Sequence, residues 1–570
     1  MVNVRSAWME FAALALAAVS TFGAVQGPAA ADVSFTTDRL SERIRIVPRD
    51  GSLRYGESDI EMNATGLALA LRRCYCSSNA TEGLFGRGWA CLFDRRIKLA
   101  TNNQQPATVH NEWGEALVFS PRGSSLLYSN SGRSQWLMVE PDRTFLRDHR
   151  ERFWSFGKDG RLEGIYNVAM VGVDIEYEAE RLARVRDAYG RSFRFTTDDD
   201  GRVIETRSSA GDLRRYDYEQ GRLARVSDAN GVRAEYSYDR QGRLSAIIIG
   251  GRERAEISYD SRGRVTGLSG PSVAERTVRY QRRTVPFPAR VTEIADALGR
   301  VTHYRFRDSP PECQVTLPGG AAATISYDER RLPVRMDLPR GRRIALQYDD
   351  FGNLKRLTLP GGAFYTFNYA ARADLRDWTR ADGATFTFAR AESGQIREVR
   401  GSRRDDVRRL AFDANGRLLA LADGPSRAIM FSCNAWGDLS GIEVQNGSTS
   451  LLFDHDESGR VSRVAPPHRP AFQVVYGAHG RPEALTDSVG YRLALARDPL
   501  GRLSAIEDCE GHRERFERDD GGRLLLWQRP DGSEVRLGYD REGNLEEVHL
   551  PEGNICRIAY NERNIATSET

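Results

Sequence analysis

The chain has 570 residues, of which 40% are hydrophobic, and this is enough to bury a large folded core. Lys and Arg number 82 and Asp and Glu number 79, so the formal net charge is only +3 at pH 7. Arginines alternate with acids and form no uncompensated basic patch, which argues against a nucleic-acid-binding protein.

Residues 1–31 are typical of an export signal. Arg5 supplies a positive start, residues 11–19 form an apolar core, and the alanines at 29–31 offer a small-residue cleavage site. The apolar stretch is too short for a membrane span, and no later segment approaches about 18 consecutive apolar residues. We therefore expect a mature chain without a transmembrane segment, exported to the periplasm, the cell surface or the medium.

Residues 32–150 predict a smaller β-rich domain. Alternating apolar residues and turn signals mark candidate strands at 67–71, 113–119 and 135–139. This region does not follow the repeat described below, so the sequence divides into residues 1–31, 32–150 and 151–570.

Seven cysteines leave an odd count. Three of them cluster near the start of the chain, where an oxidising compartment allows Cys91 to pair with Cys74 or Cys76. The other four are scattered singly and are expected to be ordinary buried strand residues. No cysteine-histidine cluster has zinc spacing, so the sequence predicts no metal site and no cofactor.

Residues 151–570 are built from one repeated unit. Tyr238-Asp239 followed by Gly242-Arg243 recurs 21 residues later as Tyr259-Asp260 followed by Gly263. Further copies carry Tyr348, Asp349 and Gly352, and then Tyr539, Asp540 and Gly543. A fixed period of this size indicates a repeat protein.

Each unit predicts a β-hairpin. Ala234, Tyr236 and Tyr238 alternate with polar residues, which is the period of a half-buried strand. The following glycine can adopt positive φ in a turn, and a second turn signal lies half a period away. Because one hairpin alone is marginal in water, the units must stack into a continuous sheet.

The spacing that recurs from unit to unit suggests structural roles for the repeated residues. An acid that returns in every unit is a structural part, because a catalytic carboxylate is needed once or twice. We expect Asp239 and Asp260 to cap their turns, with Arg243 and its counterparts packed along the stack.

This repeat resembles the YD repeats of the RHS family, the bacterial relatives of the teneurin shell. The segment at 71–79, followed by Gly86-Arg-Gly-Trp89, resembles the domain that commonly precedes RHS repeats. The resemblance implies an all-β fold, in which antiparallel hairpins form a curved or spiralling sheet that makes a partial or complete shell. It also implies self-cleavage at Asp-Pro-x-Gly motifs, but the copy at 498–501 lies in phase with the repeats and is expected to be an ordinary turn.

Two functional readings stay open. The first is an exported, non-enzymatic scaffold that encloses or presents a polypeptide cargo, as RHS shells enclose toxins, or a degenerate fragment of such a protein. The second is a cell-envelope module that binds carbohydrate or another cell. The eight histidines lie far apart and form no catalytic motif, so the sequence predicts no enzyme.

The array also stops in mid-repeat, which predicts a closing partner chain on its last strand.

Overall fold

The structure is a computed structural model. It describes residues 40–569 except residues 63–68, 100–104, 123–126, 131–134, 148–151, 282–289, 371–373, 393, 403–406, 424–427, 445–448, 468, 478–480, 499–501, 520–521, 541–543 and 561–565. The export signal expected at residues 1–31 lies outside this range.

Nearly all regular structure in the described residues is antiparallel β. The helical elements are one short helix, α2 (Leu40–Arg43), and two 3-10 turns, η1 (Leu92–Asp94) and η2 (Pro339–Gly341). From β8 onward each strand pairs with the strand before it in the chain, so the sheet order follows the sequence. This confirms the prediction of a sheet of successive hairpins. The sheet also runs past residue 151 without a break, because β12 pairs with β13.

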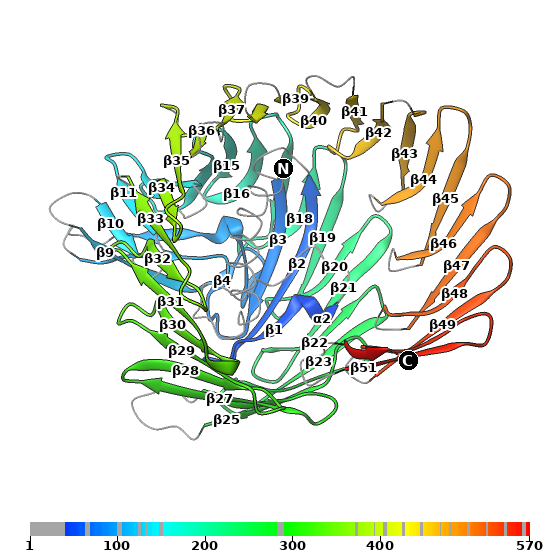
Figure 1. Ribbon diagram of the computed structural model, residues 1–570, viewed down its shortest axis with the longest axis horizontal. Coiled ribbons are helices and arrows are strands. Elements are labelled where there is room, and N and C mark those ends of the chain that lie inside the picture. The colour runs from blue at the N-terminus through cyan, green and yellow to red at the C-terminus, as the bar shows by residue number, and fades with distance from the viewer. Residues whose placement is uncertain are drawn as a thin grey trace.

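The first strands form a separate four-stranded sheet, β1-β2-β3-β6. We call residues 40–94, which contain this sheet, the inner domain, because they lie inside the curve of the large sheet (Figure 1). Its strands are β1 (Ile44–Ile46), β2 (Leu53–Met62), β3 (Leu69–Cys76), β4 (Glu82–Gly83), β5 (Gly86–Arg87) and β6 (Trp89–Cys91).

The large sheet winds as a spiral. In Figure 1 it descends from β15 and β16 through β18–β23, passes along the bottom at β25–β28 and rises on the left through β29–β35. It then crosses the top at β37–β42 and descends on the right to β51. We call β7–β31 the first turn and β32–β52 the second turn.

The strands of the first turn are β7 (Arg96–Lys98), β8 (Ala107–His110), β9 (Ala116–Pro121), β10 (Leu127–Asn130), β11 (Gln135–Val139), β12 (Thr144–Arg147), β13 (Phe153–Phe156), β14 (Leu162–Tyr166), β15 (Gly172–Glu178), β16 (Arg181–Asp187), β17 (Ser192–Thr197), β18 (Val203–Ser208), β19 (Leu213–Glu219), β20 (Arg222–Asp228), β21 (Gly231–Tyr238), β22 (Leu244–Ile249), β23 (Glu253–Tyr259), β24 (Val265–Ser269), β25 (Arg276–Tyr280), β26 (Val291–Ala295), β27 (Val301–Asp308), β28 (Pro311–Thr316), β29 (Ala322–Tyr327), β30 (Pro333–Leu338) and β31 (Arg342–Tyr348).

The strands of the second turn are β32 (Leu354–Thr358), β33 (Phe364–Tyr369), β34 (Leu375–Arg380), β35 (Thr385–Arg390), β36 (Ile396–Gly401), β37 (Val407–Phe412), β38 (Leu418–Asp423), β39 (Ala428–Cys433), β40 (Leu439–Val444), β41 (Thr449–His455), β42 (Val461–Ala465), β43 (Phe472–Tyr476), β44 (Pro482–Asp487), β45 (Arg492–Arg497), β46 (Leu503–Asp508), β47 (Arg513–Arg518), β48 (Leu524–Gln528), β49 (Glu534–Tyr539), β50 (Leu545–His549), β51 (Ile555–Tyr560) and β52 (Ala566–Glu569).

The two turns of the spiral touch through their hairpin ends. Arg191 Nη1 lies 3.0 Å from Asp438 Oδ1 across 247 residues, and both side chains are almost fully buried. Arg147 pairs with Asp374 across 227 residues. One turn of the spiral therefore takes about eleven to twelve repeats of 21 residues, since 227/21 is about 10.8 and 247/21 is about 11.8, and ion pairs join the turns along a seam.

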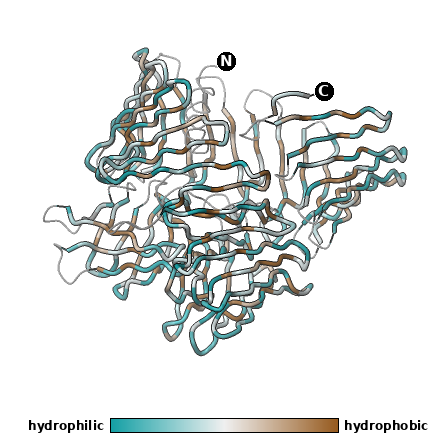
Figure 2. The backbone as a smooth tube through the Cα atoms, turned by 90° about the horizontal axis from the view of Figure 1, so that it is seen from below, coloured by the Kyte–Doolittle hydropathy of each residue, from teal (hydrophilic) through white to brown (hydrophobic). Residues whose placement is uncertain are grey.

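The main core lies between the inner domain and the first turn. Trp89, Leu53 and Phe85 of the inner domain are fully buried, as are Val185 and Leu244 of the sheet. In Figure 2 the turns are mostly hydrophilic and the hydrophobic positions recur along the strands. The outer face carries ion pairs across strands, for example Arg225 with Glu235 at 3.3 Å.

Candidate functional site

The repeat turns have one shared geometry. Asp239 Oδ1 accepts hydrogen bonds from the N–H groups of Gln241 (3.0 Å) and Arg243 (2.8 Å), and its Oδ2 accepts from Arg243 Nε at 2.6 Å. Asp260 makes the same three bonds in its own turn. Gly242 has φ of 79°, a conformation that favours glycine. The aspartate and the arginine thus close each turn.

The other expected repeat residues occupy equivalent places. Asp349 accepts from the N–H and the side-chain amide of Asn353, and Asp540 does the same with Asn544. Gly263 and Gly352 have φ of 80° and 85°, whereas Gly543 lies outside the described residues. Tyr238, Tyr259, Tyr348 and Tyr539 are half-buried.

The repeat tyrosine connects each unit to the one before it. Tyr259 donates its hydroxyl hydrogen bond to the carbonyl oxygen of Leu244 at 2.8 Å, 15 residues back. The guanidinium of Arg243 also stacks over the Tyr259 ring, with Cζ 4.7 Å from the ring centre. The same hydroxyl bond with the same separation is made by Tyr177, Tyr218, Tyr238, Tyr280, Tyr369, Tyr476 and Tyr560.

Replacing Tyr259 with phenylalanine should lower the free energy of unfolding by about 1 to 3 kcal/mol, because the carbonyl of Leu244 loses its donor. Urea unfolding measures the change. Tyr491, which is 44% exposed, serves as the control, and Tyr491→Phe should be close to neutral. Equal effects of the two changes would contradict the role of the hydroxyl.

The capping aspartates predict acid sensitivity. Burial alone would raise the pKa of Asp239 and of Asp260, but hydrogen bonds from Arg243 and Arg264 outweigh it and lower both values. Their stabilising effect is therefore complete above the unfolded-state pKa of about 3.9 and is lost as the pH falls through the lowered folded-state pKa. Urea unfolding between pH 5 and pH 2 should show this loss. Asp239→Asn with Asp260→Asn should flatten that part of the profile.

A buried arginine fastens the inner domain to the sheet. Arg73 donates from Nε to Asp59 Oδ2 at 2.5 Å and from Nη2 to Asp59 Oδ1 at 2.8 Å. Tyr216 of the first turn donates to the same Asp59 Oδ2 at 2.9 Å, and Tyr236 lies 3.3 Å from the guanidinium. Four aromatic rings surround this guanidinium at 5.0 to 5.8 Å, namely Phe85, Trp89, Tyr216 and Tyr236.

This environment shifts the ionisation of the cluster. Burial lowers the pKa of Arg73, but the charge of Asp59 outweighs it and raises the pKa, so the guanidinium stays charged. Burial raises the pKa of Tyr236 to about 12, so its hydroxyl stays neutral. Trp89, from the Gly-x-Gly-Trp segment, donates from Nε1 to Tyr238 OH at 2.9 Å. Sequence reasoning singled out the segments that contain Arg73 and Trp89 but missed Asp59 and its pairing with Arg73.

A row of backbone donors also binds the inner domain. At most repeat turns a β-bulge pairs the tyrosine position with the residue that follows the turn, as Tyr238 pairs with Leu244. We call the latter the bulge residue. In the first turn, the bulge N–H groups of Val203, Leu244, Val265 and Val291 donate to Leu84 O, Tyr75 OH, Gly51 O and Pro48 O at 2.8 to 3.1 Å.

The concave face differs between the two turns of the spiral. As far as β24, the apolar side chains of this face pack against the inner domain, and Val185, Leu223 and Leu244 have no exposed area. From β37 to β52, the buried apolar residues among those described are only Ala484, Ala505 and Val535. The larger apolar side chains of this face, such as Phe431, Phe453 and Phe516, stay half-buried.

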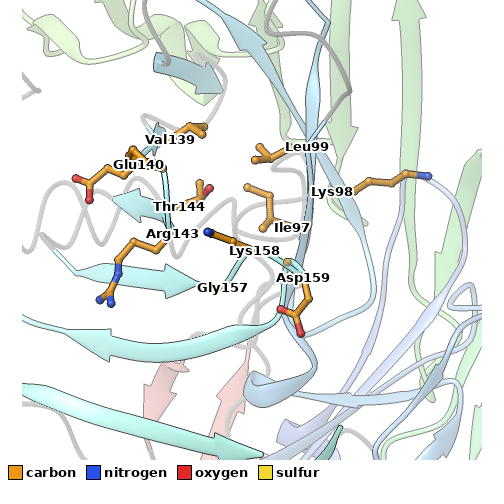
Figure 3. A pocket seen from close by; sticks show the side chains of 12 residues that line it. Ile97, Lys98, Leu99, Val139, Glu140, Arg143, Thr144, Gly157, Lys158 and Asp159 are labelled. Carbon is orange, nitrogen blue, oxygen red and sulfur yellow. The ribbon is translucent and has the colours of Figure 1, made fainter.

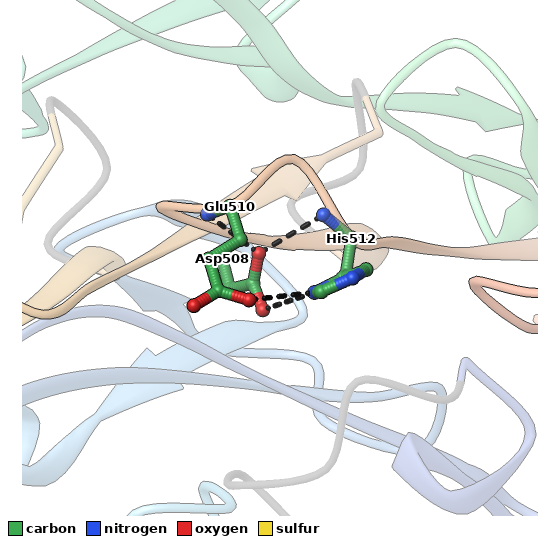
Figure 4. A group of neighbouring side chains, drawn as sticks. All are labelled: Asp508, Glu510 and His512. Atoms are coloured by element: carbon green, nitrogen blue, oxygen red, sulfur yellow. Dashed lines mark hydrogen bonds and ion pairs between the residues drawn. The ribbon is translucent and has the colours of Figure 1, made fainter.

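One turn brings together groups that could hold a metal ion. Ligand atoms of Asp508, Glu510 and His512 lie within 4.8 Å of one another (Figure 4). However, Asp508 already accepts from the N–H groups of Glu510 and His512, and its Oδ2 lies 2.9 Å from His512 Nδ1. The histidine thus replaces the usual arginine of a turn, and its pKa is raised by the hydrogen bond to Asp508. The triad is a variant of the turn cap.

A cavity of about 420 Å³ lies between the end of β7, the β11–β12 turn and the β13–β14 turn (Figure 3). Its wall includes Ile97, Leu99 and Val139, with Lys98 pointing away from the centre. Lys158 Nζ pairs with Asp142 Oδ1 at 2.8 Å. The charged groups in its wall are of mixed sign and do not converge on one point.

The disulfide expected between Cys91 and Cys74 or Cys76 is not formed. All seven thiols are free. Cys91 lies opposite Arg73 in the sheet and packs in the main core, whereas Cys74 and Cys76 pack against Trp113 on the other face. Neighbouring strand residues point to opposite faces, so the sulfur atoms are separated by the sheet.

The Asp-Pro-x-Gly motif at 498–501 begins with an aspartate in ordinary surroundings. Asp498 accepts from Arg502 N at 2.9 Å and from Arg502 Nε at 2.7 Å, as in the other turns, and residues 499–501 lie outside the described residues. Among the described residues, no helix is long and apolar enough to cross a membrane.

Family models match two parts of the chain. The model described as a domain of unknown function (DUF6531) matches residues 46–119, and the RHS Repeat model matches residues 216–254. The chain thus contains an RHS repeat. The second match covers β19–β22, which carry the turn at Asp239, and the first covers much of the inner domain.

The chain is also similar, at low sequence identity, to solved structures. They include TcdB2-TccC3 without the hypervariable C-terminal region (12% identity, TM-score 0.44, covering 91% of this chain and 30% of that chain) and TcdB2-TccC3 (12%, 0.45, 90% and 32%). A third is the Photorhabdus luminescens Tc holotoxin pore (13%, 0.43, 92% and 30%). The RHS-repeat protein thus spans less than a third of the length of these chains. No curated protein matches the sequence.

Proposed function

We propose that this RHS-repeat protein is an exported, non-enzymatic scaffold that holds a polypeptide inside the curve of its sheet. The observation that carries the proposal is the contrast between the two turns of the spiral. In the first turn, as far as β24, the concave face packs against the chain's own inner domain, whereas β37–β52 of the second turn keep apolar side chains such as Phe431 and Phe453 half-buried on the same face. A face of this kind gains stability when a polypeptide covers it.

The other reading, a surface that binds carbohydrate, predicts a row of exposed tyrosines. Instead, the repeat tyrosines such as Tyr238 and Tyr259 direct their hydroxyls to backbone carbonyls. Among the described residues, Tyr491 is the only tyrosine that is strongly exposed. The scaffold reading is therefore the better supported.

Protection from protease tests the scaffold. An unstructured reporter polypeptide with trypsin sites is fused after Thr570, and its digestion is compared with that of the free reporter. Enclosure predicts that the fused reporter is cut at least ten times more slowly while the sheet stays intact. Digestion at the rate of the free reporter would overturn the proposal.

Export is tested separately. The alanines at 29–31 predict cleavage just before Asp32, so mass spectrometry of the protein collected outside the cytoplasm should find a chain that begins there. An intact Met1 on that protein would contradict the export signal.

A further inference from the structure

The second turn of the spiral is stabilised unevenly. Strands β32–β35 share a core with β28–β31, in which the rings of Trp378 and Phe386 stack with their centres 4.4 Å apart. We call β37–β52 the wall segment, and among its described residues the buried apolar side chains are only Ala484, Ala505 and Val535. In Figure 1 its strands β43–β49 form the right-hand side of the molecule, away from the inner domain at the centre. A part of a repeat sheet with so little buried apolar area opens at a lower free-energy cost than the rest.

One repeat turn of the wall segment directs its carboxylate to the first turn of the spiral. The regular cap has an aspartate as the first residue of the turn and an arginine as the fifth, but residues 434–438 have asparagine first and aspartate fifth. Asn434 Oδ1 accepts from the N–H groups of Trp436 and Asp438, both at 2.9 Å, and so replaces the capping aspartate. The Asp438 carboxylate instead accepts from Arg191 across the seam, and the two side chains are 5% and 2% exposed.

The same arrangement recurs at another place on the seam. Asp374 is the fifth residue of the turn that begins at Ala370, whose N–H donates to Asp374 O. The side chain of Asp374 pairs with Arg147 of the first turn. In both places an aspartate at the fifth position goes with an ion pair between the turns. Because a buried charge is costly without its partner, these pairs favour one register of the second turn on the first.

A second ion pair holds the wall segment three repeats further along the chain. Arg502 Nε bonds to Asp498 of its own turn, and Arg502 Nη1 lies 3.6 Å from Glu253 Oε1 of the first turn. The side chains of Arg502 and Glu253 are 11% and 5% exposed. Between the two pairs, Arg460 bonds to Asp456 of its own turn, and its side chain is more exposed than that of Arg502. Buried ion pairs therefore hold the wall segment at two places along the seam.

We propose that the wall segment is a gate, which separates from the first turn as one body when the seam pairs of Asp438 and Arg502 break. It stays attached through the ladder between β36 and β37, while the inner domain and β28–β35 keep their own cores. Opening exposes the half-buried concave face around Phe431 at the side of the spiral. The inference rests on the proposed scaffold function, because the gate is the route by which the enclosed polypeptide enters or leaves.

A charge reversal tests the gate. Asp438→Arg places a positive charge against Arg191 and favours the open state. The matched control, Asp454→Arg, makes the same charge change on an exposed side chain of β41, which pairs with Arg463 inside the wall segment. A third variant, Asp438→Arg with Arg191→Asp, restores opposite charges across the seam. Hydrogen exchange of the full chain, followed by mass spectrometry, measures the opening of each strand.

In the wild type we expect β39–β51 to exchange as a group, at least ten times faster than β20–β24. Asp438→Arg should speed exchange at least a further tenfold over the whole of β39–β51 and leave β20–β24 unchanged. Asp454→Arg should resemble the wild type, and the paired reversal should recover most of the lost protection. Faster exchange confined to β39–β40, loss of protection in β20–β24 as well, or equal effects of Asp438→Arg and Asp454→Arg would overturn the gate.

The reporter fused after Thr570 separates failure of the gate from failure of the scaffold. If the wild type does not protect the reporter, the scaffold fails, and the exchange measurement still decides whether the wall segment opens as one body. If the wild type protects the reporter, Asp438→Arg should speed its digestion at least tenfold, whereas Asp454→Arg should not. Equal protection by the two variants would show that the wall segment is not the route, and the scaffold would stand without the gate.

Discussion

Replacing Arg73 with methionine should lower the free energy of unfolding by about 3 to 5 kcal/mol, the range found when a buried ion pair loses one partner. Arg73 has no exposed side-chain area, and Asp59 has 3%. Without the guanidinium, Asp59 keeps only the hydroxyl of Tyr216 as a donor among the contacts described for it. Urea unfolding, followed by the fluorescence of buried tryptophans such as Trp89, measures the change.

Two further variants sharpen this prediction. Arg225→Met breaks an exposed pair with Glu235, whose side chains are 45% and 41% exposed, and should cost at most about 1 kcal/mol. Asp59→Leu combined with Arg73→Met removes both buried charges and should recover much of the loss, even if Arg73→Met alone does not fold. A cost for Arg73→Met as small as that for Arg225→Met would show that the cluster does not fasten the inner domain.

Replacing Arg191 with methionine should also lower the free energy of unfolding by about 3 to 5 kcal/mol. The local destabilisation should appear in both turns of the spiral. Arg191 lies between Asp187, at 2.8 Å, and Asp438, at 3.0 Å, and all three side chains are at most 5% exposed. Its loss leaves two buried carboxylates close together. Besides urea unfolding, hydrogen exchange should become faster in β17 and in β39–β40, which are far apart in sequence.

The turn at Asp198 provides the matched control for the seam. Arg202 makes the same bonds to Asp198, but both side chains are more than 20% exposed and the pair lies within one hairpin. Arg202→Met should therefore destabilise the protein less and change exchange only in β17–β18 and the adjoining strands. If Arg191→Met altered exchange in one turn alone, the ion pair with Asp438 would not join the turns.

The repeat unit could be predicted from the sequence because its determinants are local. The positive φ of Gly242, the bonds of Asp239 to Gln241 and Arg243, and the alternation up to Tyr238 all act within a few residues. The period of 21 residues then required the hairpins to stack. These local rules determined the all-β class and the roles of the turn residues.

The partners of the repeat tyrosine depend on the three-dimensional sheet. The bond from Tyr259 to Leu244 O spans 15 residues and forms only when two strand pairs lie side by side. The cysteines also show that proximity in sequence is not enough. Their number and spacing suggested a disulfide between Cys91 and Cys74 or Cys76. The register of β3 and β6 instead places Cys91 and Cys74 on opposite faces.

The sequence by itself thus determined that the chain is a stack of hairpins with capped turns. Only the tertiary structure decided where the inner domain lies, how long one turn of the spiral is, and which side chains join the turns. The physical reason is that twist and curvature accumulate slowly from strand to strand, so the meeting of Arg191 with Asp438 depends on every intervening hairpin. The same accumulation brings Asp59 and Arg73 to Tyr216 and Tyr236, more than 150 residues away.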